Sequence, residues 1–210
     1  MAKNRNSKNW LRQHQADTYV KRSVKDGYRS RAIYKLIEID ERDQLIKPGQ
    51  NILDLGAAPG GWSEWAAKKT GLSGRVVAVD ILSMAAIPGV INLQLDLQQS
   101  NSIDQIRNCF EHRQVDLVLS DMAPNLSGVR SVDQARAMHL AELALESACE
   151  LLGPGGKMLI KVFQGSGFDQ FRSQMLQHFQ NVKTRKPQAS RPKSREIYLL
   201  GSELVVSTPD

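Results

Sequence analysis

The sequence predicts a three-layer α/β fold, in which helices cover both faces of a mostly parallel sheet of about seven strands. The first observation is that apolar runs alternate with helix-compatible stretches after residue 49. The second is that these runs are almost continuously apolar, as strands buried on both faces are. The third is a turn of small residues directly after the first apolar run, where such folds bind ligands.

The part of the chain before this alternation is expected to be separate from the main domain. The predicted division is a mobile tail at residues 1–9, a helical segment at 10–48 and a main domain at 49–210. In the helical segment, helices are expected over Trp10–Arg22 and Ser30–Gln44, and Gly27 separates them. Pro48 and Gly49 then turn the chain into the main domain.

The main domain is expected to alternate strands and helices. Strands are predicted over Asn51–Leu55, Arg75–Val79, Ile91–Leu95, Val115–Ser120 and Lys157–Phe163. Helices are predicted over Trp62–Lys69, Ile103–His112, Val132–Leu152 and Phe168–Phe179. Ser102 and Gln105 have the spacing of a capping box, and the run Gly153–Gly156 is a helix stop.

The end of the chain departs from this alternation. Two strand-like runs, Val182–Lys186 and Glu196–Leu200, are joined by a polar, basic loop without a helix. Strands joined without a crossover helix pair antiparallel, so we expect these two runs to pair antiparallel at one end of the sheet, with the last strand antiparallel.

Positive charge is concentrated in two blocks of the chain. The formal net charge is +6 and the isoelectric point is about 9.4, which suits a polyanionic partner. One block spans residues 3–35 and the other spans residues 183–195. If the blocks meet in space they form one phosphate-binding surface, and the alternative is two unrelated solvated segments. The candidates for phosphate contacts are Arg29, Arg31, Lys186, Arg191 and Arg195.

Several classes of protein are disfavoured by composition. No stretch approaches the ~20 consecutive apolar residues that span a bilayer, and the N-terminus lacks the apolar core of a secretory signal. Cys109 and Cys149 lie in helix-compatible segments without metal or redox spacing, and the histidines are scattered. We therefore expect a cytoplasmic protein that uses no metal.

A turn rich in small residues follows the first predicted strand and opens a helix. Gly56, Ala58, Gly60 and Gly61 let the backbone approach a ligand closely. The pattern also fits a dinucleotide fingerprint, so NAD is the alternative ligand. Pro59 favours S-adenosylmethionine, because it removes a backbone donor from the loop that would otherwise hold a pyrophosphate.

Aspartates close predicted strands at the ligand-binding edge of the sheet. Asp54 is placed to meet the ammonium group of an amino-acid ligand, Asp80 to meet both ribose hydroxyls, and Asp96 to meet an adenine amino group. Asp121 closes the fourth strand and completes the set. A single aspartate would be expected to cap a helix or begin a turn. The whole set, behind a small-residue loop, predicts S-adenosylmethionine binding in a Rossmann-like methyltransferase domain.

Two features bear on the reaction itself. Enzymes that methylate base amines often have an aromatic residue directly after a proline at this point, whereas here Asn125 follows Pro124, which disfavours a base amine as target. Lys161 lies inside an otherwise apolar strand, where a charge is costly unless it is paired. Asp121 on the adjacent strand is the expected partner of Lys161. The alternative is an ion pair, or a side chain reaching to the sheet edge, with a structural role alone.

At these residues the chain resembles the FtsJ-like 2′-O-ribose methyltransferases. The matching stretches are 29–32 with 35–36, 54–62, 120–125 with 127–128, 161–165, and 185–187 with 194–196. The resemblance implies a catalytic set at Lys35, Asp121, Lys161 and Glu196. It also implies cofactor contacts, which join those already expected of Asp54 and Gly56. These contacts fall on Gly60, Trp62, Asp80, Asp96 and Asp121.

The resemblance also implies a particular substrate. It implies methylation of the ribose 2′-hydroxyl of a uridine in the A-loop of 23S ribosomal RNA, within the large (50S) ribosomal subunit. The N-terminal helical segment is then expected to contact the RNA, and the enzyme is expected to act as a monomer. Two alternatives of other classes are an NAD-dependent oxidoreductase and an RNA-binding assembly factor that retains an inactive cofactor site.

The chemical role of Lys161 stays open at the level of sequence. Asp121 and Glu196 favour its ammonium form, whereas burial, Lys35 and the sulfonium of the cofactor favour the neutral amine. Lys161 is therefore either a general base or a cation that orients the ribose.

Overall fold

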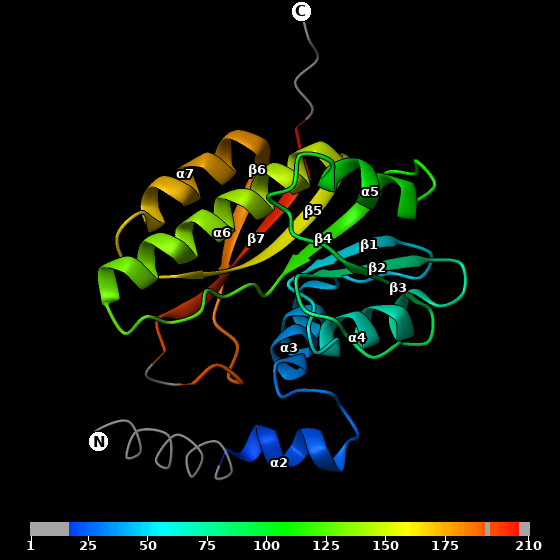
Figure 1. Cartoon of the computed structure of the whole chain (residues 1–210), viewed down its shortest axis with the longest axis horizontal. Coiled ribbons are helices and arrows are strands. Elements are labelled where there is room, and N and C mark those ends of the chain that lie inside the picture. The colour runs from blue at the N-terminus through cyan, green and yellow to red at the C-terminus, as the bar shows by residue number, and fades with distance from the viewer. Residues whose placement is uncertain (1–16, 192–193, 206–210) are drawn as a thin grey trace, which may run out of the picture.

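One sheet organises the chain. In the computed structural model, which describes residues 17–191 and 194–205, seven strands form this sheet in the order β3-β2-β1-β4-β5-β7-β6 (Figure 1). The strands are β1 (Asn51–Leu55), β2 (Arg75–Asp80), β3 (Val90–Gln94), β4 (Val115–Ser120), β5 (Leu152–Phe163), β6 (Phe179–Arg185) and β7 (Glu196–Leu204). β7 runs opposite to the other six strands and pairs antiparallel with both β5 and β6 at one end of the sheet. The predicted fold class is confirmed.

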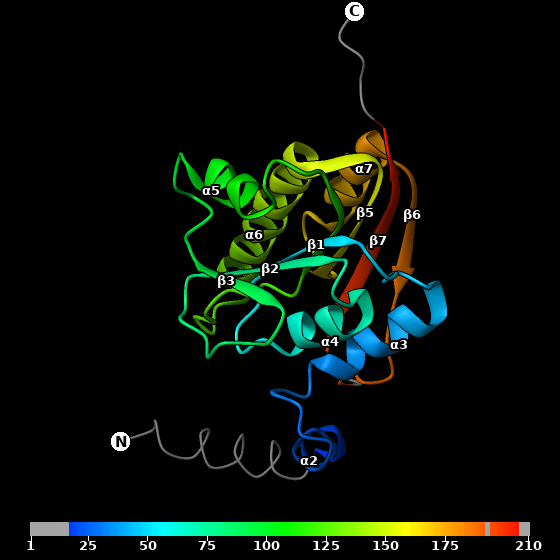
Figure 2. The same cartoon turned by 90° about the vertical axis from the view of Figure 1, so that its right-hand side faces the viewer.

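Helices cover both faces of the sheet. They are α2 (Thr18–Lys25), α3 (Ile33–Asp43), α4 (Gly61–Thr70), α5 (Ser102–Cys109), α6 (Arg130–Leu151) and α7 (Phe168–His178). Figure 2 shows α3 and α4 on one face and α5, α6 and α7 on the other. The core divides in the same way, because Leu36, Trp62 and Leu159 belong to one apolar cluster and Leu53 and Phe171 to another.

The alternation of side chains along β1 explains how one residue reaches the ligand-binding edge. Ile52 packs in the α3–α4 cluster, whereas Leu53 and Leu55 pack in the opposite one. Asp54 points to the same face as Ile52, since it accepts a hydrogen bond from Ser63 of α4. The continuous apolar pattern of β1 therefore serves two cores, and Asp54 interrupts it on the side covered by α4.

The strand β5 is longer than the sequence predicted. The run Gly153–Gly156 does end α6 at Leu151, but it continues as strand and does not wait until Lys157. The register with β4 shifts between Val115 and Leu117, so the extra residues form an irregularity in the ladder. Such a bulge accommodates Pro154, which has no N–H to donate to the neighbouring strand.

Two expectations at helix starts need correction. The capping box at Ser102 and Gln105 is wrong, because Asn101 is the N-cap of α5 and the hydroxyl of Ser102 donates to the Leu97 carbonyl. The first predicted helix, Trp10–Arg22, begins outside the described residues, as does the tail at 1–9. In the described part, α2 starts at Thr18 with Asp17 as its N-cap and extends past Arg22 to Lys25. No helix of the described residues is long and apolar enough to cross a membrane.

Candidate active site

Lys161 and Asp121 form a buried pair where β5 and β4 end. Lys161 Nζ lies 3.1 Å from Asp121 Oδ1 and donates to the backbone oxygen of Asp121 at 2.5 Å. The two side chains are 6% and 18% exposed. The parallel register causes the contact, because Ser120 pairs with Ile160 and the next residue of each strand then meets the other. The expected contact is present, and its catalytic role remains a prediction.

Lys35 and Glu196 form a second pair beside the first. Lys35 Nζ lies 2.7 Å from Glu196 Oε1, and both side chains are largely buried. Lys35 comes from α3 and Glu196 from the first position of β7. The same carboxylate oxygen accepts a hydrogen bond of 3.0 Å from the hydroxyl of Ser190. The structure therefore brings an N-terminal helix and the last strand together at one point.

Tyr198 joins the two pairs, and sequence reasoning did not identify it. Its hydroxyl donates to Asp121 Oδ1 at 2.8 Å and lies 3.5 Å from Glu196 Oε1. Lys35 Nζ lies 5.8 Å from the centre of the Tyr198 ring. Burial, with help from the two neighbouring carboxylates, raises the pKa of Tyr198 well above its usual value, so the phenol remains a neutral donor.

A signal for Tyr198 was present in the sequence. Residues 196 and 198 lie two apart in a strand and therefore share one face. The β5–β7 register places Tyr198 directly opposite Lys161. The tyrosine was overlooked because it lies in a run that otherwise consists of apolar core residues.

The four charged side chains balance within this cluster. Two ammonium groups face two carboxylates, which lowers the cost of holding them out of water. Lys161 Nζ already donates a hydrogen bond to the backbone oxygen of Asp121 and forms an ion pair with its carboxylate. As an ammonium it keeps one further N–H for a substrate oxygen, and as a neutral amine it keeps a lone pair instead. Both roles proposed for Lys161 are compatible with these contacts.

Asp54 is a buried carboxylate with one oxygen left without a partner. It is 1% exposed, and its Oδ2 accepts a hydrogen bond of 2.5 Å from the Ser63 hydroxyl. Its Oδ1 is buried and has no partner in the structure. Burial raises the pKa of Asp54 to about 7, the hydrogen bond from Ser63 opposes this, and Asp121 and Asp80 add to it. An unpaired carboxylate of this kind is suited to a cationic ligand group, as the ammonium of S-adenosylmethionine is.

The glycine turn next to Asp54 has no space for side chains. Gly56 has φ +71°, and a Cβ there would lie 2.4 Å from Met122 Cγ. Gly60 has φ +104°, and a Cβ there would lie 2.5 Å from Ile87 Cδ1. Gly60 is also the N-cap of α4, so the first backbone N–H groups of that helix face the turn. The turn therefore packs closely against Met122 and Ile87, and its predicted contact with a ligand stays a prediction.

Trp62 serves packing with its side chain. The indole is 3% exposed, donates to the Ala32 carbonyl at 2.9 Å and lies 5.8 Å from the Tyr198 ring. Any contact from Trp62 to a cofactor would therefore come from its backbone, in the first turn of α4. The Trp62 ring instead packs against the Tyr198 ring.

The remaining aspartates of the set also hold the backbone. Asp80 accepts hydrogen bonds from the Ala58 amide at 2.9 Å and the Leu82 amide at 2.8 Å, which fixes the glycine turn against β2. Asp96 is exposed and accepts from the Gln98 amide at 3.0 Å, as an aspartate that begins a turn does. Their contacts to ribose and adenine stay predictions.

The two basic blocks meet in the described structure. Arg31 donates to the Ala189 carbonyl at 2.5 Å and lies 3.0 Å from Asp17, which is also 3.7 Å from Arg191. Arg185 and Asp43 add a further pair at 2.5 Å. In their described parts the blocks therefore form one surface, although carboxylates are interleaved with the cations. Residues 3–16 of the first block and Lys193 of the second lie outside the described residues.

The predicted phosphate-binding residues differ in how free they are. Arg29 donates to the carbonyls of Ala85 and Ala86, and Lys186 donates to those of Ser194 and Glu196, so these two side chains hold loops in place. Arg31 is engaged as described above. Arg191 and Arg195 are exposed, as Lys186 is, and Arg191 also lies 3.7 Å from Asp17.

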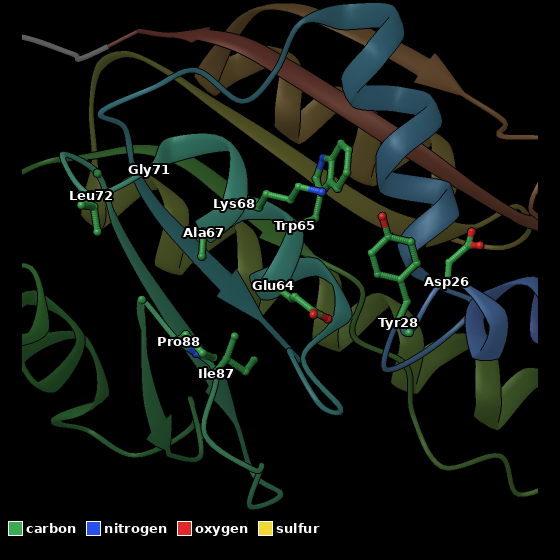
Figure 3. Close-up of a pocket in the computed structure, with 13 residues that line it drawn as sticks. Asp26, Tyr28, Glu64, Trp65, Ala67, Lys68, Gly71, Leu72, Ile87 and Pro88 are labelled. Carbon is green, nitrogen blue, oxygen red and sulfur yellow. The ribbon is translucent and has the colours of Figure 1, made fainter.

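One cavity lies away from the cluster of Lys161, Asp121, Tyr198, Glu196 and Lys35. It has a volume of about 660 Å³ and runs along α4, between Tyr28, Trp65 and the segment Ile87–Gly89 (Figure 3). None of the predicted catalytic or cofactor-binding residues lines it. Its link to the site is indirect, because Ile87 also covers Gly60. In the described part of the chain, no group of three or more His, Cys, Asp and Glu side chains could hold a metal ion.

Comparisons with known proteins agree with this geometry. Residues 28–204 match the FtsJ-like methyltransferase family. The chain is 54% identical over 196 residues to the ribosomal RNA large subunit methyltransferase E of Chromohalobacter salexigens, covering 93% of each chain. It is 53% identical over 201 residues to the protein of the same name from Nitrosospira multiformis, covering 96% of this chain and 98% of the relative.

Solved structures with a similar fold include a methyltransferase that acts on RNA by name. A ribosomal RNA methyltransferase from Plasmodium falciparum superposes with a TM-score of 0.75 at 29% identity, over 84% of this chain and 98% of that one. Fibrillarin, in its complex with Nop5p, superposes with a TM-score of 0.54 at 19% identity, which supports the fold alone.

Proposed function

Because this chain belongs to the FtsJ-like methyltransferase family, we propose that it methylates the ribose 2′-hydroxyl of a uridine in 23S ribosomal RNA, with S-adenosylmethionine as methyl donor. The observation that carries the proposal is the buried cluster of Lys161, Asp121, Tyr198, Glu196 and Lys35 beside the glycine turn. The large-subunit RNA is proposed because the relatives are named for it. The A-loop of the assembled 50S subunit is the proposed location.

The residues that would hold the cofactor lie along the carboxyl ends of β1, β2 and β3. Asp54 Oδ1 would accept from the ammonium group, and the turn Gly56–Gly60 would follow the methionine portion closely. Asp80 and Asp96 would receive the ribose and the adenine. When bound, S-adenosylmethionine supplies an electrophilic methyl group on a sulfonium centre.

Lys161 and Asp121 would act on the ribose oxygen. A ribose hydroxyl is a weak nucleophile, so a group that accepts its proton or holds its lone pair in line increases the rate. Lys161 is kept in one position by a hydrogen bond to the Asp121 backbone oxygen and an ion pair with the Asp121 carboxylate. The Tyr198 hydroxyl donates to the same carboxylate oxygen, Oδ1. The proton leaves either to Lys161 or to solvent, according to which form of the amine is present.

Lys35 and Glu196 would place the substrate. Lys35 is fixed by Glu196, and Glu196 by Ser190, so neither side chain is free to swing away. An ammonium group held beside the ribose suits a neighbouring hydroxyl or phosphate oxygen. The absence of an aromatic residue after Pro124 supports a ribose rather than a base amine as target.

Methyl transfer to purified ribosomal particles tests the proposal. Large subunits from cells that lack the gene are incubated with the protein and S-adenosylmethionine carrying a labelled methyl group, and 2′-O-methyl positions are mapped. We expect one new uridine mark in the A-loop, absent with Lys161→Ala. No label on any RNA would contradict methyl transfer. Binding of RNA without label would instead favour the assembly factor, and NAD binding without S-adenosylmethionine binding would favour the oxidoreductase.

A further inference from the structure

The connection between β4 and α6 exposes apolar side chains next to the catalytic cluster. This connection, residues 122–129, begins directly after Asp121. Leu126 and Val129 are 78% and 54% exposed, and Val132 in the first turn of α6 is 39% exposed. Single exposed aliphatic residues are ordinary, but several of them so close in the chain and beside a site indicate a contact surface.

The connection is held at both ends. At its start, Met122 packs against the α6-side core and fills the space beside Gly56. At its end, Asp133 accepts hydrogen bonds from the Ser127 amide at 2.6 Å, the Ser127 hydroxyl at 2.7 Å and the Gly128 amide at 3.1 Å. The bonds from Ser127 hold the pKa of Asp133 below its usual value, so the carboxylate stays charged. The apolar side chains are therefore presented on ordered backbone, which reduces the entropy lost on binding.

This connection crosses from β4 over the end of β5 to the start of α6 (Figure 1). Gln134 of α6 donates hydrogen bonds to the carbonyls of Phe163, the last residue of β5, and of Ser166. Gln134 and Arg195 both lie against Gly165, so the far end of the connection is close to the basic surface. Leu126 lies five positions after Asp121, a span of at most about 18 Å. An RNA strand that places its ribose at Lys161 and a phosphate at Arg195 therefore passes this connection.

We propose that Leu126 and Val129 form an apolar platform that contacts nucleobase faces of the substrate RNA beside the methylated ribose. The inference rests on the function proposed above. Bases beside a ribose in a single-stranded RNA loop are splayed out and unstacked, which exposes their apolar faces at a cost of about a few kcal/mol per step. Covering such faces with aliphatic side chains offsets part of that cost. The platform replaces the aromatic residue that base-amine enzymes carry near this point.

The test compares the double variant Leu126→Ser, Val129→Ser with the control Leu72→Ser. Leu72 is fully exposed, as a control for an exposed leucine should be. It lies between the end of α4 and the start of β2, away from the carboxyl ends of the strands where the site lies. Binding to a protein-free ribosomal RNA fragment and methylation of large subunits are measured over a range of salt concentrations. We expect about a tenfold rise in Kd and KM for the double variant. The slope of log Kd against log salt should stay unchanged, since no phosphate contact is removed. Leu126→Phe should bind at least as well as the wild type.

The outcomes separate this inference from the proposed function. If the double variant binds and methylates like Leu72→Ser, the platform does not exist, while methylation by the wild type would still support the function. If the variant fails on intact subunits but binds protein-free RNA normally, the surface contacts a ribosomal protein, and the inference is wrong. If the wild type methylates no RNA, it is the proposed function that fails.

Discussion

Lys161 can lie inside an apolar strand because its amine reaches two oxygens of Asp121. The charge of Lys161 is compensated by its direct neighbour Asp121. This compensation depends on Tyr198, whose hydroxyl keeps Asp121 Oδ1 in place. At the scale of single residues, the site is therefore a chain of contacts in which each group fixes the next. Removing one link should change the chemistry before it changes the fold.

Replacing Lys161 tests what its amine does. Lys161→Ala should lower kcat by about 10²–10⁴-fold while S-adenosylmethionine still binds, since a positioned proton acceptor contributes that much. Lys161→Arg keeps the charge but cannot accept a proton. Rates are measured against pH for both variants, with the exposed Lys68→Ala as control. An arginine variant with a near-normal rate would exclude the general base and leave the orienting cation.

Asp54 predicts that cofactor binding depends on pH. Its pKa is about 7 in the free protein, and an adjacent ammonium group would lower it. Below pH 7, binding must therefore release a proton, so affinity should rise with pH, by up to about tenfold per unit, and level off above 7. Calorimetry at pH 6 in buffers of different ionisation enthalpy measures the released protons. Asp54→Asn should bind more weakly and without this dependence; an unaltered pH profile in that variant would place the ammonium elsewhere.

The same pKa has a consequence for the free protein. Because the folded value lies above the usual value near 3.9, Asp54 favours folding most at pH below about 4. That contribution is lost as the pH rises through about 7, and a bound cation restores it above that pH.

At the scale of elements, the helices α3 and α4 are joined by a buried carboxylate. Asp40 is 2% exposed, and it accepts hydrogen bonds from the Ile46 amide at 2.8 Å and the Trp65 indole at 3.0 Å. This contact fixes α3, which carries Lys35, against α4, which begins at the glycine turn. The distance between the predicted catalytic residue Lys35 and the predicted cofactor-binding turn is therefore set partly by Asp40, which lies outside the site.

Removing this contact should destabilise the protein. Asp40→Ala leaves two donors without partners in a buried place, which should lower the free energy of unfolding by about 2–3 kcal/mol. Urea denaturation measures the change. Asp104→Ala removes an exposed carboxylate that pairs with Arg107, and it should change stability by less than about 0.5 kcal/mol. Equal effects in the two variants would show that Asp40 does not join the helices.

Much of this element structure could be predicted from local patterns. The apolar runs predicted β1 and β4 with the correct bounds, because a buried strand can be recognised from its own residues without knowing which strands it pairs with. The start of β5 could not be predicted, since Gly153–Gly156 has the composition of a turn. It belongs to the strand because the residues on either side, Leu152 and Lys157, pair with β4. Tyr198 was not predicted as a site residue for a related reason. Its position opposite Lys161 depends on the register between β5 and β7, which the sequence alone does not give.

At the scale of the whole molecule, charge is arranged by the meeting of the chain's two basic blocks. Their meeting could be expected from sequence, but the carboxylates that join them could not. Asp17 lies between Arg31 and Arg191, and Asp43 is paired with Arg185. Fewer cations are therefore free for phosphates than a count along the sequence suggests. Arg191 and Arg195 are exposed, and Lys186 is exposed but donates to two backbone carbonyls.

Removing these exposed charges should flatten the salt dependence of RNA binding. For Arg191→Ala with Arg195→Ala, the slope of log Kd against log salt should fall by about 0.7–0.9 per lost phosphate contact. Filter binding or fluorescence anisotropy at several salt concentrations gives the slope. Arg107→Ala, on α5, is the matched control and should leave it unchanged. The same slope in both would place the phosphate contacts elsewhere.

The position of β7 also decides when this protein can begin to work. β7 is the last of the strands to be synthesised, yet it lies between β5 and β6, and it carries Glu196 and Tyr198. While the chain is still being translated, β5 and β6 have unpaired edges and the catalytic cluster is incomplete. The predicted catalytic cluster is therefore complete only once β7 has inserted between β5 and β6, and a partly folded copy without β7 would lack both Glu196 and Tyr198 at the site.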